Sequence, residues 1–296
     1  MAVVPGDIDL VAAARPPARR GVVASYVRRH PTVVVGGALL ALMAAMAVFA
    51  PFLGTIDPTA LAPSHRLRWP SAEYWFGSDM LGRDIYSRTI YGARVSLTVG
   101  ISVALLSTGL GLFIGLVTGF YRWVDAVVMR IMDGLMSIPA VLIAIALMAL
   151  TRASLQNVIF AITVAEVPKV TRLVRSIVLT LREQPFVEAA IASGTTQIRV
   201  MWRHIVPNTL ATLLVQGSYI AASAMITEAI LSFIGAGTPP TTPSWGNIMA
   251  EGRAVFLVAY YIVLFPGIFL SLTVLAINLL GDGLRDAIDP RLARRL

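Results

Sequence analysis

The chain has 296 residues, of which 57% are hydrophobic and 14% are charged. Soluble domains carry about 25% charged residues, so the composition excludes an ordinary soluble domain and indicates a membrane protein. The net charge is +8, but the arginines lie at the ends of apolar runs rather than in one patch, which indicates membrane topology and no nucleic-acid partner. Cysteine is absent, so disulfides, thiolate metal sites and cysteine catalysis are excluded.

A polar N-terminal tail, residues 1–32, comes first and is too long for the start of a typical signal peptide. A membrane-spanning helix needs about 20 apolar residues, and six apolar runs follow the tail. In chain order, the expected spans cover residues 33–53, 95–121, 134–150, 153–165 with a continuation, 210–227 with a continuation, and 254–280. We therefore expect an all-α polytopic membrane protein with six transmembrane helices.

Charge counts predict how these spans are oriented. The tail 1–32 has five Arg against two Asp, the segment 169–208 has six basic residues against two acidic ones, and the tail 284–296 has four Arg against two Asp. An excess of Lys and Arg in short loops marks the cytoplasmic side. Both ends and the segment 169–208 are therefore expected in the cytoplasm, and the balanced segment 54–93 and the loop 234–259 are expected outside.

The fourth span is too short to cross the bilayer alone, so its helix must continue into a charged stretch. Glu166, Lys169, Arg172 and Arg175 recur every three residues there and form one polar stripe. The stripe either lines the cytoplasmic half of a pathway or is solvated where the helix projects into the cytosol. Pro168 allows a kink nearby.

The second span carries a stripe of small residues. Gly111, Gly115 and Gly119 recur every four residues, a spacing that lets two helix backbones approach closely. This stripe predicts a helix–helix contact rather than a chemical site.

Catalytic patterns are missing from the sequence. It has no phosphate-binding loop, no H-E-x-x-H zinc motif and no G-x-S-x-G nucleophile motif. Four acids, Asp133, Glu166, Glu228 and Asp282, lie within or near apolar runs. They would suit an ion-coupled carrier, or they are caps and ion-pair partners at the ends of the spans. Energy from ATP would have to come from another chain.

The segment 182–208 interrupts the apolar pattern. Pro185 suits the first position of a helix, and Glu188 would then lie near its positive end. Gly194 can end that helix, Thr195 or Thr196 can cap the next one, and Pro207 would mark a bend into the fifth span. The residues predict a cytoplasmic helix–turn–helix whose first helix is too short to be stable alone.

This segment resembles a known motif. Glu188, Ala189 and Ala190, followed by Gly194 and by His204 and Pro207, are similar to the EAA motif of permease subunits of ATP-binding-cassette (ABC) importers. His204 stands where Ile is usual, and Val206 stands where Leu is usual.

Three further stretches resemble dipeptide and oligopeptide permeases: residues 76–100, 228–253 and 265–291. Together they cover nearly all of the chain from about residue 30 onward. The long external segment after the first span is typical of the second, C-type subunit of the permease pair. The resemblance implies the type I ABC importer permease fold, with five of the helices in a permease domain at residues 94–283.

The resemblance also implies roles and partners. A second permease, two ATPase subunits or one fused ATPase, and an extracytoplasmic peptide-binding protein would assemble with this chain in a bacterial cytoplasmic membrane. ATP and Mg²⁺ would bind to the ATPases, so this chain holds no cofactor and is no enzyme. The alternative cargo is a nickel chelate or another small solute, and the alternative class is an ion-coupled carrier.

Three groups of candidate site residues follow. The coupling motif comprises Glu188, Ala189, Ala190, Gly194, His204 and Pro207, with His204 expected to pack. Candidates for contact with the binding protein are Asp79, Arg83, Asp84 and Trp245. Alternatively, the first three form a local ion-pair cluster, and Trp245 anchors at the membrane interface. Candidates for the pathway lining are Glu166, Lys169, Arg172 and Glu228.

Overall fold

The computed structural model describes residues 31–288, so most of the predicted N-terminal tail and residues 289–296 of the C-terminal tail lie outside the described residues. The expectation of an all-α chain is confirmed for this part. The helices are α2 (Pro31–Val48), α3 (Ile85–Phe120), α4 (Arg122–Met136), α5 (Ala140–Leu150), α6 (Leu155–Arg182), α7 (Pro185–Ala192), α8 (Gln197–Val200), α9 (Val206–Phe233), α10 (Trp245–Gly252) and α11 (Tyr261–Ile288). Short 3₁₀ turns lie at Ala50–Phe52, Pro63–His65 and Arg253–Val255, and a π-helical turn lies at Met201–Ile205.

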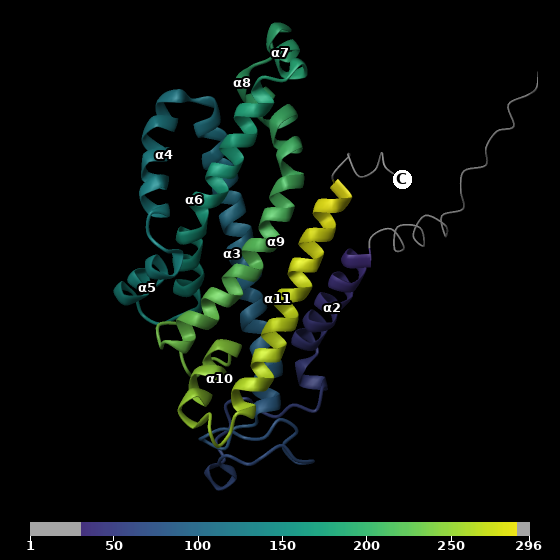
Figure 1. Ribbon diagram of the computed structural model, residues 1–296, viewed down its shortest axis with the longest axis vertical. Helices are drawn as coiled ribbons and strands as arrows, with labels where there is room; N and C mark the ends of the chain where they lie inside the picture. Colours follow the sequence, from purple (N-terminus) through teal and green to yellow (C-terminus); the bar gives the residue numbers. More distant parts are fainter. Residues whose placement is uncertain (1–30, 289–296) are drawn as a thin grey trace, which may run out of the picture.

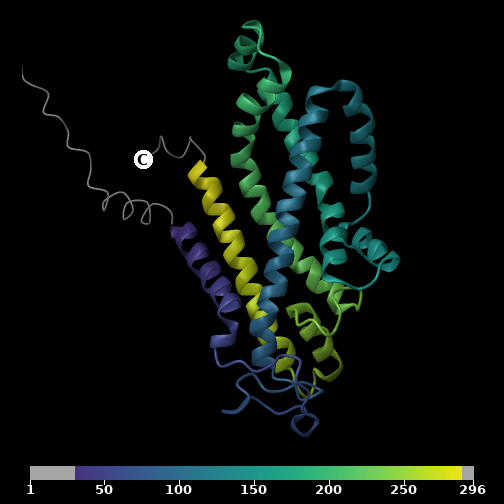
Figure 2. The ribbon, with the colours of Figure 1, turned by 180° about the vertical axis from the view of Figure 1, so that it is seen from behind.

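The two ends of the helix bundle differ in what they carry (Figure 1). One end carries α7 and α8, and the start of α2 and the end of α11 point toward that same end. The opposite end carries the irregular segment 54–84 and α10, as the view from behind also shows (Figure 2). This arrangement is expected if the segment around α7, the N-terminal end of α2 and the C-terminal end of α11 share one side of the membrane.

The number of spans is only partly supported. Within residues 31–288, four helices are long and apolar enough to cross a membrane: α2, α3, the continuous helix Gln197–Phe233, and α11. The pair α4 and α5 qualifies together but is bent by 91°, which gives up to five. Helix α6 has 28 residues, or about 42 Å of helix, but charged side chains interrupt its apolar character. The six-span prediction is therefore not confirmed.

The third predicted span, 134–150, has different bounds in the structure. Helix α4 begins at Arg122 and ends at Met136, and α5 begins only after Pro139. Proline disfavours helical conformation in the residue before it and removes one backbone donor, so the chain breaks at Ser137–Pro139 and turns. The proline in this otherwise apolar run was the available signal.

The external segments also have different bounds. Helix α3 begins at Ile85, ten residues before the predicted start, because Asp84 caps it by accepting a hydrogen bond from the backbone N–H of Ser87 at 2.8 Å. The predicted external segment 54–93 therefore ends at Asp84. In the same way, the predicted loop 234–259 contains α10, and the last span begins at Tyr261 rather than at residue 254.

Helices α3 and α6 pack closely, as the glycine stripe predicts. A Cβ atom added at Gly111, Gly115 or Gly119 would lie 2.5 to 2.6 Å from atoms of Val170, Val174 or Val178. Each valine therefore occupies the space that a side chain on α3 would need. This close packing joins α3, which starts at the end of the bundle that carries the segment 54–84, to α6, which leads into α7.

Candidate coupling segment and external ion-pair network

Helix α7 forms as the sequence predicts, and Gly194 ends it. Pro185 is at its first position and Glu188 lies in its first turn. Gly194 has φ +80°, its N–H bonds to the Ile191 carbonyl at 2.9 Å, and the Thr195 N–H bonds to the Ala190 carbonyl at 3.1 Å. This pair of bonds is a Schellman motif, which places glycine at the left-handed position.

The end of the bundle around α7 exposes apolar side chains. Only Val187 of α7 is buried, whereas Phe186 is 43% exposed, Ile191 53% and Trp202 63%. Glu188 is also exposed, and no side-chain hydrogen bond caps the N-terminus of α7, so Glu188 does not cap its own helix. An eight-residue helix with this exposure needs a further packing surface.

The second half of the predicted helix–turn–helix is different from the prediction. Helix α8, the π-helical turn and α9 form one continuous helix, Gln197–Phe233. Pro207 lies in the first turn of α9 and marks no break. The π-helical turn just before Pro207 accommodates the missing proline N–H without ending the helix. Thr196 holds the N-cap position of α8, but its side chain makes no capping hydrogen bond.

His204 lies between the two arms of this segment. Its ring is 6.3 Å from the ring of Phe186 in α7, with the two planes tilted by 49°. The structure therefore places His204 in the packing between α7 and the long helix, as expected.

The polar stripe of α6 is divided between two environments. Arg172 forms an ion pair with Asp133, and Arg175 forms one with Asp125, whose carboxylate also accepts from Arg175 Nη2 at 2.6 Å. Both acids are on the amphipathic helix α4, and the pairing of Asp133 agrees with the interpretation of this acid as an ion-pair partner. The Arg172 side chain remains 50% exposed, which agrees with the solvated interpretation, whereas that of Arg175 is 31% exposed beside α4.

The first two residues of the stripe pair with each other. Lys169 Nζ lies 2.8 Å from Glu166 Oε1. The Glu166 side chain is 4% exposed, whereas that of Lys169 is 44% exposed. Of this pair, only Lys169 faces open space within the described chain.

Two of the four candidates for contact with the binding protein, Asp79 and Arg83, belong to a buried ion-pair network. Asp79 Oδ2 accepts from Arg83 Nε at 2.6 Å and from Arg88 Nη1 at 2.6 Å. Arg88 also donates to Glu251 of α10 at 2.6 and 3.1 Å, and Arg83 pairs with the same carboxylate. Asp79, Arg83 and Asp84 are at most 8% exposed, so they are buried from a docked protein in this conformation. The alternative of a local ion-pair cluster agrees with the geometry of Asp79 and Arg83, whereas Asp84 forms no ion pair within residues 31–288 and caps α3 instead.

Arg88 and Glu251 are the members that sequence reasoning missed. Arg88 was counted as part of a loop, whereas it lies on α3 and is 1% exposed. Glu251 lies in the predicted loop 234–259 and meets Arg88 only in the tertiary structure. Hydropathy places the start of this span at residue 95, so the sequence carries no local signal that pairs Arg88 with Glu251.

Trp245 is also buried rather than at a surface or a membrane interface. It is 0% exposed, and its indole N–H donates to the Thr89 carbonyl of α3 at 2.9 Å. The hydrogen bond of Trp245 therefore connects the first residue of α10 to α3, and the ion pair of Glu251 with Arg88 connects the last turn of α10 to α3.

Glu228 is enclosed by the chain's own external loop. It is 0% exposed, and its Oε1 accepts from the hydroxyls of Ser232 at 2.8 Å and Ser244 at 2.9 Å. Beside it, Asn247 Nδ2 donates to the carbonyls of Thr238, Pro239 and Thr242 at 3.0 to 3.1 Å. The predicted pathway role of Glu228 has no support from this placement.

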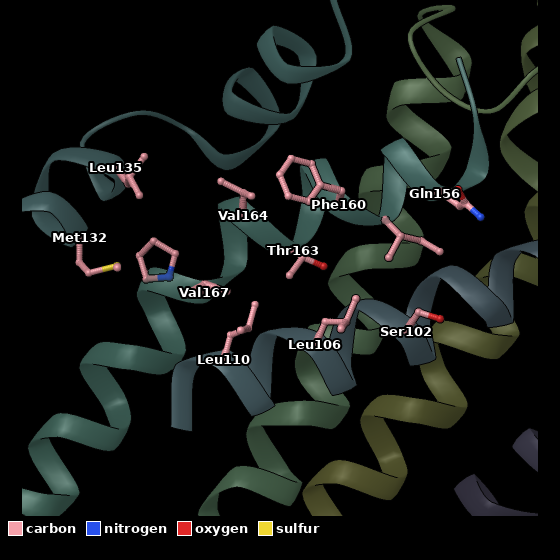
Figure 3. A pocket seen from close by; sticks show the side chains of 12 residues that line it. Ser102, Leu106, Leu110, Met132, Leu135, Gln156, Phe160, Thr163, Val164 and Val167 are labelled. Carbon is pink, nitrogen blue, oxygen red and sulfur yellow. The ribbon is translucent and has the colours of Figure 1, made fainter. Parts of the chain in front are cut away.

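A cavity of about 620 Å³ lies between α3, α4 and α6 (Figure 3). Most of its lining is apolar and includes Leu106 and Leu110 of α3, Met132 and Leu135 of α4, and Phe160 and Val167 of α6. Neither Glu166 nor Lys169 contributes to it. The cavity suits apolar groups and not a charged cargo.

Comparisons with known proteins give the family. Residues 107–294 match the binding-protein-dependent transport system inner membrane component, and residues 23–70 match the N-terminal transmembrane domain of oligopeptide transport permease C. A probable peptide ABC transporter permease of Sinorhizobium fredii is 50% identical over 268 residues, which are 90% of this chain and 92% of the relative. A dipeptide transport system permease of Alkalihalophilus pseudofirmus is 41% identical over 266 residues, which are 90% of this chain and 88% of the relative.

The fold is similar to that of a solved ABC transporter chain. The MetNI methionine transporter in an inward-facing conformation superimposes with a TM-score of 0.54 over 69% of this chain and 98% of that chain, at 21% identity. The resemblance indicated by the EAA-like motif is thus confirmed, and an ion-coupled carrier is not supported. The chain belongs to the family of binding-protein-dependent transport system inner membrane components.

Proposed function

We propose that this chain is one of two permease subunits that form the pathway of an ATP-driven peptide importer. An extracytoplasmic binding protein delivers di- or oligopeptides, and ATPase subunits bind ATP and Mg²⁺ on the cytoplasmic side. The cargo proposal is supported by relatives named as permeases for peptides, dipeptides and glutathione. The proposed orientation is supported by the excess of arginine in the segment around α7.

The observation that carries the coupling role is the exposed surface of α7. Phe186, Ile191 and Glu188 are exposed on a helix that is too short to be stable alone. In this proposal they dock into a groove on an ATPase subunit, and Ala189, Ala190 and Gly194 allow close approach and the turn that follows.

The connections of α7 explain how docking would move the spans. Two residues, Glu183 and Gln184, separate α7 from α6. On the other side, the turn at Gly194 leads into the continuous helix that contains α9. Displacement of α7 when the ATPases close on ATP would therefore be passed to both α6 and α9, with the π-helical turn as the place where the long helix adjusts.

The test uses the complex of both permeases and the ATPases in proteoliposomes. Gly194→Val forces a β-branched residue to positive φ, and Glu188→Lys reverses the exposed charge. We expect peptide uptake to fall to background while membrane insertion and ATP hydrolysis persist. Ser193→Ala, at a neighbouring position with φ −77°, is the matched control. Unchanged uptake in both variants would remove the docking role.

The cargo is tested separately with a panel of di- to octapeptides and a nickel chelate. ATP-dependent uptake of peptides is the expected result. Uptake of the chelate without uptake of any peptide would overturn the peptide assignment and leave the coupling role intact.

A further inference from the structure

Two exposed tryptophans at the external end are each supported by an anchored tyrosine. The ring of Trp69 lies 5.7 Å from that of Tyr261, and the Tyr261 hydroxyl donates to the Ser78 carbonyl at 3.1 Å. The ring of Trp75 lies 4.7 Å from that of Tyr86, and the Tyr86 hydroxyl donates to a backbone carbonyl at 2.8 Å. Both tryptophans remain 56% exposed. Each indole is therefore held in place on one side and open on the other.

These tryptophans lie outside the hydrocarbon of the membrane. The segment 54–84 has little regular structure and lies beyond the external ends of α2, α3 and α11 (Figure 1). Lipid-exposed irregular backbone does not occur within the hydrocarbon region, and the segment also exposes Asp57, Arg66 and Glu73. In water, rigid exposed aromatic side chains next to arginine are typical of protein interfaces.

The buried ion-pair network fixes this segment to the helices. Asp79 accepts backbone hydrogen bonds from Leu81 and Arg83 at 2.8 and 2.9 Å, which closes the turn that follows the tryptophans. Arg88 then joins Asp79 to α3, and Glu251 adds α10. Three glycines in the segment have positive φ, and a Cβ at Gly82 would lie 1.8 Å from the Ala62 carbonyl oxygen. The conformation is thus specified at several points.

We propose that Trp69 and Trp75 are contact points for the extracytoplasmic binding protein, and that Arg88 is the positioning residue that holds their segment on α3. This inference rests on the proposed function, and the dependence of the family on a binding protein supplies the partner. Arg66 is exposed and forms no ion pair within residues 31–288. The matching surface therefore has apolar recesses for the indoles and a carboxylate near Arg66.

The experiment measures ATP hydrolysis by the complete transporter in lipid nanodiscs while its peptide-loaded binding protein is titrated. The binding protein used is one that supports peptide uptake by the wild-type transporter. We expect Trp69→Ala and Trp75→Ala each to raise the concentration for half-maximal stimulation roughly tenfold, with unchanged hydrolysis in its absence. Trp123→Ala is the matched control, because Trp123 is 81% exposed on α4, away from the external segment. Trp69→Phe should lie between wild type and Trp69→Ala.

Arg88 is tested by the same titration. Arg88→Lys keeps the charge but loses the bidentate fork, so it should raise the half-maximal concentration, and Trp69→Ala should add little in the Arg88→Lys background. If Arg88→Lys prevents assembly of the transporter, Glu251→Gln is titrated in its place. A purely structural role for Arg88 would lower unstimulated hydrolysis and yield without moving the titration midpoint, and that result would overturn the positioning role.

The outcomes separate this inference from the proposed function. If the wild-type transporter shows no binding-protein-dependent uptake, the proposed function fails. If wild-type uptake is normal but neither alanine variant moves the midpoint, only the docking inference fails. The inference is equally overturned if the variants change thermal stability in lipid without moving the midpoint, because the tryptophans would then contact lipid headgroups.

Discussion

Replacing Gly115 with alanine should weaken the contact between α3 and α6. A Cβ at this position would lie 2.6 Å from Val174 Cβ and 2.9 Å from the Thr171 carbonyl oxygen. Carbon atoms in normal contact are about 3.5 to 4.0 Å apart, so α3 and α6 would have to separate by about 1 Å. Neither neighbouring atom is the end of a flexible side chain, and the helix backbones themselves must therefore move.

The cost can be isolated by comparison with a glycine of the same helix. Overpacking of this kind costs about 1 to 3 kcal/mol, while alanine gains up to about 1 kcal/mol in helix propensity. Gly109 is also on α3, but a Cβ there meets nothing within 4 Å. Since the propensity gain is common to both positions, Gly115→Ala should be about 1 to 3 kcal/mol less stable than Gly109→Ala.

Thermal unfolding of the two variants in the same detergent measures this difference. A loss of 1 kcal/mol in the free energy of unfolding corresponds to a fall of about 2 to 4 °C in melting temperature for a chain of this size. Leucine should widen the gap, because Gly115→Leu adds bulk to the contact while Gly109→Leu adds bulk to open space. Equal melting temperatures for Gly115→Ala and Gly109→Ala would refute the close packing of α3 on α6.

Arg88→Met removes one of the two guanidinium groups that pair with Asp79 and Glu251, while Arg83 still contacts both carboxylates, so unfolding stability should fall by about 1.5 to 3 kcal/mol; a loss below about 1 kcal/mol would mean that the network contributes little. The pair of Asp125 and Arg175 is 20% and 31% exposed, so a double-mutant cycle with Asn and Gln should give a coupling of about 1 kcal/mol or less. A coupling above about 3 kcal/mol would instead indicate a fully desolvated pair. Asn247→Ala removes the donor shared by three loop carbonyls, so limited proteolysis within residues 238–242 should become faster, and an unchanged cleavage rate would contradict the bracing role of Asn247.

Local pattern was sufficient for much of the fold. The apolar runs predicted the long helices, Pro185 and Gly194 predicted the bounds of α7, and the glycine stripe predicted its helix contact. Errors arose where polar residues lie inside helices or apolar residues lie in a break. Because Arg88 is charged, the first ten residues of α3 were predicted to be a loop. Pro139 was predicted to lie within a span. The tertiary partners of Arg88 and the backbone restriction at Pro139 outweighed the average hydropathy of the surrounding residues.

The sequence by itself determined that this chain is a membrane permease, because hydropathy, the charge bias and the EAA-like spacing are properties of neighbouring residues. The tertiary structure decided which charges meet. Arg88 and Glu251 are 163 residues apart in the chain, and Arg175 and Asp125 are 50 apart, so no local pattern pairs them. Once the helices pack, burial makes an unpaired charge costly. Asp79 and Arg83, which were predicted to contact the binding protein, therefore pair within the chain and hold the segment that carries Trp69 and Trp75.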